Sequence, residues 1–402
     1  MLNIFDLRQL DADPAMEFSA YAKARRLAPG EVCAHISVSG LIGKGGAGFP
    51  VSRKLELIMK RAAGTRHVVI NGGEHEPGSA KDRYLLEKYP LTVFEGALIL
   101  AHTVSANVLH FAVPESAVGA LEMLRGIKEK FMRDMKPCVL DVRISPVPES
   151  YLLGEESALL EKLNGRPPLP RERPPFPIEE GIDGRPTLVH NVETAAHLPY
   201  IVLHGPSRYR ALSPAGLGVT LCTFGPEFIN DGVRLVPLGI SLHEVVMGYG
   251  GGLKSGRPIK AVQPGGPSGG FLDRGELDVR FDHASLREVD AALGCGVIRA
   301  FDDDADMLQE LSRITEFFVD NSCGQCPGCR MQTQILHRIM QQTLAGEGSD
   351  KLLAQAPIVI RANAAKGICG FIRMPGPPVL SALKKFRPDF ARDRRKLRVD
   401  AP

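Results

Sequence analysis

The stretch NSCGQCPGCR (residues 321–330) places three cysteines, Cys323, Cys326 and Cys329, three positions apart in a polar turn. The spacing Cys-x2-Cys-x2-Cys is typical of the first three ligands of a [4Fe–4S] cluster, and the glycines between them let the backbone wrap around a metal centre. Such a cluster needs a fourth ligand. Cys369, in KGICGF, also lies beside glycines, and a helical hairpin before it would return the chain to the same place. A structural zinc site is the alternative, although zinc sites favour paired Cys-x2-Cys units.

The composition around this stretch is that of an ordinary globular protein. A chain of 402 residues is long for a single core, so two or three domains are expected. A net charge of +3 is nearly balanced and does not indicate nucleic-acid binding. The basic run KKFRPDFARDRRKLRV (384–399) is interpreted as a solvated helix end or tail, with an acidic partner surface as the alternative.

The sequence shows no signal for export or membrane insertion. The N-terminus carries charges too early for a signal peptide, and the most apolar span, 91–113, is interrupted by Glu95, two histidines and an asparagine. We expect that span to be a buried helix followed by a strand. The expected location is the cytoplasm, where clustered cysteines indicate metal or redox chemistry instead of disulfides. The isolated cysteines are interpreted as small buried hydrophobic residues: Cys33, Cys138, Cys222 and Cys295.

Strand-like runs alternate with helical patterns in the first half of the chain, which indicates an α/β layer architecture. The predicted strands are 67–70, 108–113 and 139–147, and the predicted helices are 51–63, 90–104, 115–131 and 154–165. The expected regions are a lead-in (1–35), the α/β domain (36–212), a small β-rich domain of the β-grasp sort (213–285) and a C-terminal helical bundle (286–402).

A glycine-rich loop, GLIGKGGAGFP (40–50), leads into the helix predicted from Val51. Such a loop lets backbone N–H groups approach a phosphate or a flat ring, and the helix N-terminus adds partial positive charge. A glycine-rich turn has a purely structural role about as often as a ligand-binding one. This loop has neither the usual glycine spacing of a dinucleotide-binding site nor a Walker lysine–serine pair.

Three further segments carry polar side chains that a scaffold alone does not need. NGGEHEPGSAKDR (71–83) follows a predicted strand, and HNVET (190–194) offers amide and hydroxyl groups for a phosphate or ring edge. YLLGEESALL (151–160) places an acidic pair at a helix start, where helix capping alone would also account for it.

These motifs, together with GRPPLPRERPPFP (165–177) and ICGF, follow one another in the same order as in one family. The chain resembles the flavin-carrying, NADH-oxidising 51 kDa subunit of respiratory complex I and the diaphorase subunits of soluble hydrogenases and formate dehydrogenases. The resemblance covers residues 36–390. It implies an FMN-binding α/β domain, a β-grasp (SLBB-like) domain and a helical bundle that carries a [4Fe–4S] cluster.

The resemblance also implies roles for individual residues. FMN would be held by Gly43, Gly45, Gly46, Lys54, Asn71, Glu74, Val189, Asn191 and Thr194. Four residues would sit by the flavin and the ribose: Tyr151, Gly154, Glu155 and Glu156. NADH would lie near Gly46, Phe49, Lys54 and Glu76, with Phe176 stacked on its adenine. The cluster ligands would be Cys323, Cys326, Cys329 and Cys369. No acid–base catalyst is assigned, because hydride transfer to a flavin needs geometry more than a proton shuttle.

Four positions depart from the family pattern. Complex I members usually have an acid at Gly73, a glycine at His75, a second adenine-stacking aromatic at Leu57 and an asparagine at His190. Losing one stacking ring is expected to weaken NADH binding, since base–aromatic stacking contributes about 1–3 kcal/mol per base in nucleic-acid sites. The sequence therefore does not decide whether the chain binds NADH or NADPH.

The expected function is a redox relay from NADH through FMN to the cluster and on to a partner, or the reverse. The chain has no second cluster motif, so we expect the partner to be a separate iron–sulfur subunit, such as a thioredoxin-like [2Fe–2S] subunit, or a ferredoxin, in a hetero-oligomer. The alternatives are a stand-alone flavin reductase with a structural cluster, and a non-catalytic assembly or binding subunit.

Overall fold

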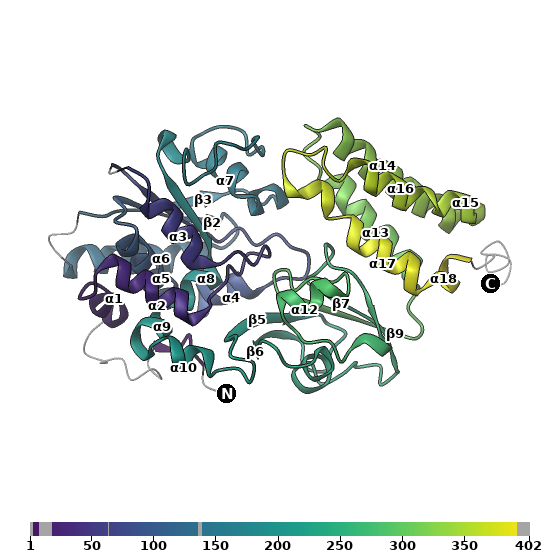
Figure 1. The fold of residues 1–402 in the computed structure, drawn as a ribbon, viewed down its shortest axis with the longest axis horizontal. Coiled ribbons are helices and arrows are strands. Elements are labelled where there is room, and N and C mark those ends of the chain that lie inside the picture. Colours follow the sequence, from purple (N-terminus) through teal and green to yellow (C-terminus); the bar gives the residue numbers. More distant parts are fainter. Residues whose placement is uncertain (1–2, 8–17, 63, 136–138, 392–402) are drawn as a thin grey trace. The chain divides into compact units, whose positions relative to one another are not determined.

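The computed structural model describes residues 3–7, 18–62, 64–135 and 139–391 (Figure 1). Cys138 and the end of the basic run lie outside these residues. The chain divides into two compact units, the first formed by Met1–Thr223 with Val233–Ile240 and the second by Phe224–Gly232 with Ser241–Pro402.

A four-stranded parallel sheet is the centre of the first unit. Its strands are β1 (His67–Asn71), β2 (Val108–Pro114), β3 (Asp141–Val147) and β4 (Thr187–Asn191), in the order β3-β2-β1-β4. The chain builds outward from β1 through β2 to β3 and then places β4 on the other side of β1. Open sheets bind ligands at such a switch point, outside the carboxyl ends of the strands.

The predicted strands β1, β2 and β3 are confirmed, whereas β4 was not predicted. The five residues TLVHN are a short run between the proline-rich loop and a helical pattern, and no alternation identifies them as a strand. Their pairing with β1 makes them one.

Helices pack against this sheet and against one another. They are α1 (Ser19–Ala24), α2 (Pro29–Ser39), α3 (Val51–Met59), α4 (Lys81–Lys88), α5 (Pro90–Thr103), α6 (Val118–Asp134), α7 (Glu156–Leu163), α8 (Val192–Ala196), α9 (Leu198–His204) and α10 (Pro206–Arg210). The helices predicted over 51–63, 90–104, 115–131 and 154–165 are confirmed as α3, α5, α6 and α7, each with slightly different ends.

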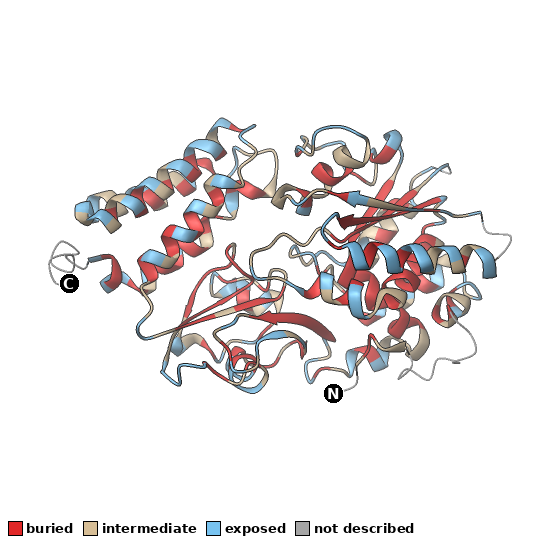
Figure 2. Cartoon of the chain, turned by 180° about the vertical axis from the view of Figure 1, so that it is seen from behind, coloured by how far each residue is buried: buried red, intermediate tan, exposed pale blue. Residues whose placement is uncertain are grey.

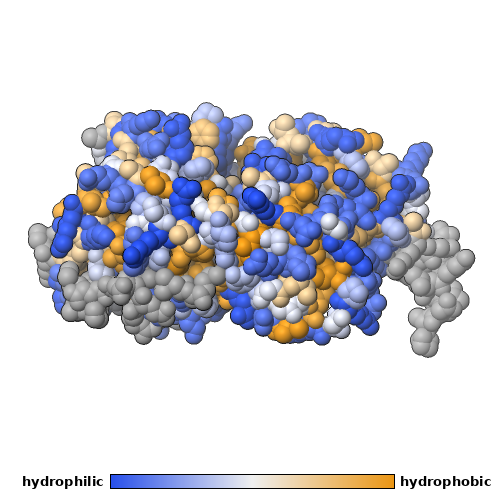
Figure 3. All heavy atoms as spheres, turned by 60° about the horizontal axis from the view of Figure 1, so that its bottom comes forward, coloured by the Kyte–Doolittle hydropathy of each residue, from blue (hydrophilic) through white to orange (hydrophobic). Residues whose placement is uncertain are grey.

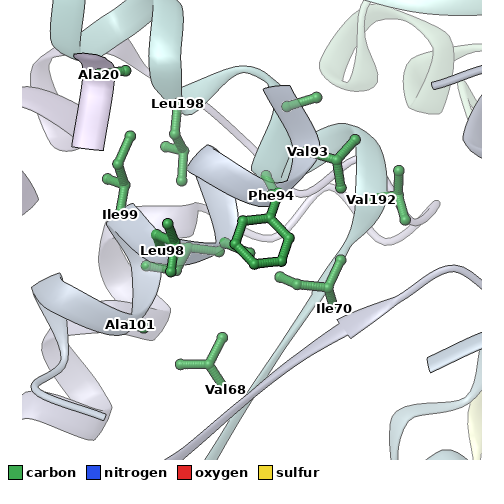
Figure 4. Packing of buried hydrophobic residues seen from close by; sticks show 14 of the residues in the cluster. Ala20, Val68, Ile70, Val93, Phe94, Leu98, Ile99, Ala101, Val192 and Leu198 are labelled. Atoms are coloured by element: carbon green, nitrogen blue, oxygen red, sulfur yellow. The ribbon is translucent and has the colours of Figure 1, made fainter. Parts of the chain in front are cut away.

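Successive strand residues point to opposite faces of the sheet, and every residue of β1 and β2 is buried, whereas β3 includes exposed residues; the central strands are therefore covered on both faces. Val68 and Ile70 belong to the large core that contains Phe94 and Leu98 of α5, as Figure 4 shows, while Val69 belongs to a smaller cluster with Leu159 of α7. The apolar span 91–113 is accordingly a buried helix and strand. Figure 2 colours the buried residues of the chain red. Among the described residues, no helix is long and apolar enough to cross a membrane.

Strands β5 (Val219–Phe224) and β6 (Gly232–Pro237) follow α10. The second unit contains α11 (Leu242–Glu244), the short π-helix η4 (Val245–Tyr249), α12 (His283–Glu288) and the antiparallel strands β7 (Ile259–Pro264), β8 (Leu272–Asp273) and β9 (Val297–Asp302), with β7 paired to both β8 and β9. Strand β9 lies in the stretch expected to be helical, and the sequence analysis missed it. Its six residues interrupt a run of helical patterns and become a strand through pairing with β7.

The second unit ends in a group of helices: α13 (Met307–Asp320), α14 (Pro327–Gln342), α15 (Asp350–Leu353), α16 (Gln355–Asn363), α17 (Gly376–Lys385) and α18 (Arg387–Ala391). Helix α13 packs against α14 and α17, and α16 packs against the same two helices. The four long helices therefore close a ring of contacts, which can be followed in Figure 1.

Candidate functional site

Two asparagines stand side by side at the switch point of the parallel sheet. Asn71 ends β1 and Asn191 ends β4, and they are partners in the β1–β4 register. Asn71 donates from Nδ2 to the carbonyl of Leu153 at 3.0 Å. Asn191 caps α8 by accepting the backbone N–H of Glu193 at 2.9 Å. Both amides are therefore held in place at the edge where a parallel sheet binds ligands.

The glycine loop closes against the end of β4. A bridge between Ile42 and Pro50 joins its two ends. Gly46 (φ 98°) and Gly48 (φ 63°) adopt left-handed backbone conformations that favour glycine. A Cβ at Gly45 would come within 3.3 Å of the Cβ of Asn191, so the loop lies directly on that residue.

Thr194 anchors the glycine loop through a hydrogen bond. It is completely buried, and its Oγ1 accepts the backbone N–H of Lys44 at 2.9 Å. The Lys44 side chain is also buried and donates to the carbonyl of Val219 at 2.9 Å. Burial lowers the pKa of this lysine to about 8, although Glu193 counteracts the effect.

The acidic pair at the start of α7 has two different tasks. Glu155 is the N-cap of α7, accepts the N–H of Ala158 at 3.0 Å and pairs with Arg173. Glu156 instead pairs with Lys54 at 2.6 Å. Burial would raise the pKa of Glu156, but Lys54 and Arg173 outweigh burial and hold that pKa below its ordinary value. Capping therefore accounts for one member of the pair only.

Lys54 links two of the predicted segments. Besides Glu156, its Nζ donates to the carbonyl of Val189 on β4 at 2.9 Å. Helix α3, the start of α7 and the middle of β4 thus meet at the Lys54 ammonium group.

The acids of the segment 71–83 also differ in their contacts. Glu74 accepts the backbone N–H groups of Asp82 (3.0 and 3.1 Å) and Arg83 (2.9 Å) at the start of α4. Glu76 accepts the hydroxyl of Tyr151 at 3.0 Å, which joins this segment to the motif 151–160. The structure thus brings Glu76 and Tyr151 together and gives Glu74 a helix-capping contact.

A cluster of buried charges lies under the glycine loop, and the sequence analysis did not predict it. Lys81 contacts Asp82 at 2.7 Å and Glu193 at 3.1 Å, and Asp82 accepts Nδ2 of Asn191 at 2.6 Å. Burial raises the pKa of Asp82 to about 7. Burial would also raise the pKa of Glu193, but Lys81 and its other partners outweigh burial and hold it well below its usual value. The available signal was the charged residues Lys81 and Asp82 in KDR and Glu193 in VET, which the sequence does not mark as buried.

The residues at this site fit FMN. In the part of the chain that the structure describes, the buried Nε2 atoms of His75 and His190 have no hydrogen-bond partner. The loop has glycines where it lies on Asn191, and lysines, amides and hydroxyls surround it. Unpaired buried polar atoms beside an open glycine loop are suited to a polar ring and a phosphate.

Two aromatic rings are available for stacking. Phe49, in the glycine loop, is 49% exposed and Phe176 is 46% exposed. On the face drawn in Figure 3, hydrophobic residues lie among hydrophilic ones. Residue 57 is a leucine, which has no aromatic ring for stacking on the adenine.

Four of the cysteines of the second unit lie near one another: Cys323, Cys326, Cys329 and Cys369. Cys326 and Cys329 stand at the start of α14, and Cys369 directly precedes a 3-10 turn over Gly370–Arg373. The backbone N–H of Ile368 donates to Sγ of Cys326 at 3.4 Å, so the distant segment reaches the turn. Burial raises the pKa of Cys329 to about 11, and the charges of Cys369, Cys326 and Cys323 raise it further while Ser322 lowers it. Four thiols of this kind fit a [4Fe–4S] cluster.

Among the described residues, no three histidines, cysteines or acids are placed to hold a single metal ion. A cubane binds each thiolate through a different iron atom, so its ligands stand farther apart than those of one ion.

Two family models match the chain. The Nuo51 FMN-binding domain matches residues 36–200, and the NADH-ubiquinone oxidoreductase-F iron-sulfur binding region matches residues 309–393. The predictions of FMN, a [4Fe–4S] cluster and NADH as substrate are thereby confirmed.

Several relatives align with nearly the whole chain. The second F subunit of the NADH-quinone oxidoreductases of Rhizobium meliloti is 33% identical over 371 residues, which cover 90% of this chain and 88% of the relative. The NADH-quinone oxidoreductase F subunit of Mycobacterium tuberculosis is 33% identical over 390 residues (93% and 86%). The HndC subunit of the NADP-reducing hydrogenase of Solidesulfovibrio fructosivorans is 30% identical over 386 residues (93% and 78%).

A solved structure shows the same fold. The air-oxidised NAD+-reducing [NiFe]-hydrogenase superposes with a TM-score of 0.86 at 29% identity, over 97% of this chain and 66% of that chain. The chain therefore spans about two thirds of that hydrogenase chain. Its mixed α/β fold with a parallel sheet is shared with that structure. With both family models and these near full-length relatives in agreement, the chain belongs to the family of NADH-quinone oxidoreductase F subunits, the FMN- and [4Fe–4S]-binding NADH oxidoreductases.

Proposed function

We propose that this chain is the subunit at which electrons pass between NADH and a partner iron–sulfur protein, through FMN and one [4Fe–4S] cluster, in either direction. One observation carries the proposal. The glycine loop lies on Asn191 and is fastened by Thr194 at the switch point of the parallel sheet. That edge of a sheet is where a flavin phosphate and ring find backbone N–H groups and fixed amides.

We propose the predicted residues as the FMN site. Asn71 and Asn191 are held at the sheet edge, and Lys54 donates to the carbonyl of Val189 on β4. Thr194 supports this proposal indirectly, because its contact positions the loop. The full set is Gly43, Gly45, Gly46, Lys54, Asn71, Glu74, Tyr151, Gly154, Glu155, Val189, Asn191 and Thr194.

We propose that NADH lies against the glycine loop, with Phe49 and Phe176 as its aromatic contacts and Glu76 and Glu156 as its acidic ones. The exposure of both rings supports this, since a stacking surface has to be open before the nucleotide binds. Because Leu57 supplies no second ring for the adenine, we expect a weaker hold on the nucleotide than in relatives that have one.

When bound, FMN supplies the chemistry that converts a hydride from NADH into single electrons. The chain's own residues bind FMN and NADH and orient them. The Lys54–Glu156 pair places a fixed positive and a fixed negative group at one point, and Glu76 is held by the Tyr151 hydroxyl. Such fixed groups lower the cost of bringing donor and acceptor into line.

The proposed cluster ligands are Cys323, Cys326, Cys329 and Cys369. We propose the ring of α13, α14, α16 and α17 as the four-helix bundle that carries the cluster, and the strands β5 to β9 as a β-grasp (SLBB-like) domain. The domain boundaries at 35/36, 212/213 and 285/286 stay predictions.

We propose a hetero-oligomer in which an iron–sulfur subunit or a ferredoxin exchanges electrons with this chain. The relatives are named as subunits of NADH-quinone oxidoreductases and of a hydrogenase, which supports assembly into a larger complex. The cytoplasm stays the proposed location, because the cysteine grouping suits a reducing compartment.

The test separates the relay from a stand-alone flavin reductase. Cys326→Ala in the full, anaerobically prepared chain removes one cluster ligand. We expect NADH to bleach the flavin absorption as in the wild type, while reduction of a [2Fe–2S] ferredoxin falls at least tenfold. Cys295→Ala is the control, since Cys295 lies outside the cysteine turn. Undiminished ferredoxin reduction by Cys326→Ala would contradict the relay and favour the stand-alone reductase.

A further inference from the structure

His75 has one ring nitrogen engaged and one nitrogen without a partner. Its Nδ1 lies 3.2 Å from Oε2 of Glu149. Its Nε2 has no hydrogen-bond partner among the described residues, although the side chain is only 8% exposed. A buried polar atom left unpaired is destabilising, so it calls for a ligand or a water.

The position of Gly73 shows where that nitrogen lies. A Cβ added at Gly73 would come within 3.2 Å of Nε2 of His75 and within 3.0 Å of Oδ1 of Asn71. The imidazole thus fills the space into which a side chain at residue 73 would grow. Asn71, at the end of β1, accepts the backbone N–H of Gly73 at 2.9 Å and is fixed at the sheet edge. The unpaired nitrogen and the Asn71 oxygen therefore converge on one small region at the proposed FMN site.

We propose that His75 is a direct contact of the bound flavin, with Nε2 accepting a hydrogen bond from an isoalloxazine N–H, and that its charge state sets the midpoint potential of the flavin. This rests on the proposed FMN site. The Glu149 carboxylate accepts Nδ1–H and so selects the tautomer in which Nε2 is the acceptor.

The charged groups that act on His75 are Glu149, from the segment after β3, and Glu74, from its own loop. Burial lowers the pKa of His75 below 6.5, and the two carboxylates only partly counteract it. The ring is therefore neutral at pH 7.5 and gains a proton as the solution becomes acidic. A positive charge beside the flavin stabilises its reduced, more negative form, so it raises the midpoint potential.

His75→Gln in the full chain tests the proposal, because glutamine cannot titrate. FMN is titrated into the flavin-depleted protein at pH 7.5 and followed by its fluorescence. Glutamine keeps an acceptor oxygen, but its flexible side chain lacks the ring that Glu149 orients, so we expect the Kd to rise by up to about 10-fold, which corresponds to the weakening of one neutral hydrogen bond. Spectroelectrochemical titration of the FMN-loaded protein between pH 5.5 and 8.5 is the second readout. Below pH 6.5 the wild-type potential is expected to lie above that of His75→Gln, by a difference that shrinks as the pH rises.

Two further variants keep the test decisive. Glu149 is half exposed, so Glu149→Gln should fold, and it should move the acidic inflection of the wild-type potential to lower pH. His35→Gln, on α2, is the matched control and should change neither readout; Nδ1 of His35 is also without a partner among the described residues. FMN affinity and a pH profile that are unchanged in folded His75→Gln would overturn the inference. Failure of the wild-type chain to bind FMN at all would overturn the proposed function instead.

Discussion

At the scale of single residues, Glu193 holds the buried charges together. It accepts the N–H of Leu221 at 2.8 Å and the hydroxyl of Thr220 at 3.0 Å, and it lies 3.1 Å from Nζ of Lys81. Lys44 and Lys81 place two buried ammonium groups in the same cluster. Removing one partner from such a cluster leaves a charge buried without compensation.

We therefore expect Glu193→Gln to lower the free energy of unfolding by about 3–5 kcal/mol. The chain has no tryptophan, so circular dichroism during chemical denaturation is the measurement. Asp82→Asn is the matched variant. Asparagine keeps the shape of Asp82 and can still contact Asn191, so we expect a loss of about 1 kcal/mol or less at pH 4, where Asp82 of the folded wild type is protonated.

The two acids also give opposite pH dependences. The pKa of Asp82 is raised to about 7 by burial, so its ionisation destabilises the fold as the pH rises from about 4 to 7. The pKa of Glu193 is lowered, so its contribution is present above its ordinary pKa of 4.5 and is lost in acid. Asp82→Asn should therefore gain stability relative to the wild type between pH 4 and 7. A constant difference over that range would contradict this assignment.

At the scale of elements, the contact between α5 and α8 positions the proposed FMN site. Helix α8 begins directly after Asn191 and carries Thr194, and α5 packs closely against it. Gly96 makes this approach possible, because a Cβ there would lie 1.9 Å from the carbonyl oxygen of Ala195. No ordinary contact is that short, so a side chain at residue 96 would push α8 away.

We expect Gly96→Ala to weaken FMN binding at least tenfold and to lower the Tm, even though alanine is the better helix former by about 1 kcal/mol. FMN fluorescence titration and thermal unfolding are the measurements. Gly126→Ala on α6 is the control, since a Cβ there meets nothing within 4 Å and should raise the stability slightly. Wild-type FMN affinity in Gly96→Ala would show that α8 does not position the site.

At the scale of the whole molecule, the FMN site and the cysteine grouping belong to two compact units. We expect Cys369→Ser to reduce bound iron and acid-labile sulfide severalfold while the Kd for FMN stays within about twofold, because each unit has its own core. Iron and sulfide analysis and FMN titration are the measurements. Cys295→Ser serves as the control and should keep the iron. Full iron content in Cys369→Ser would exclude Cys369 as the fourth ligand.

The sequence by itself determined the parts whose signal is local. The strands β1, β2 and β3, the helices α3, α5, α6 and α7, the glycine loop and the three-cysteine turn each carry their own pattern within a few residues. Spacing, periodicity and glycine content were sufficient there, because local sterics and burial decide those structures.

Only the tertiary structure decided the rest. It made TLVHN a strand by pairing it with β1, brought the segment of Cys369 to Cys326, and gathered Lys44, Asp82 and Glu193 around one buried point. It also placed the unpaired Nε2 of His75 next to the position that a Cβ at residue 73 would occupy. These features depend on residues far apart along the chain, and their energies come from burial and from distances that no local pattern encodes.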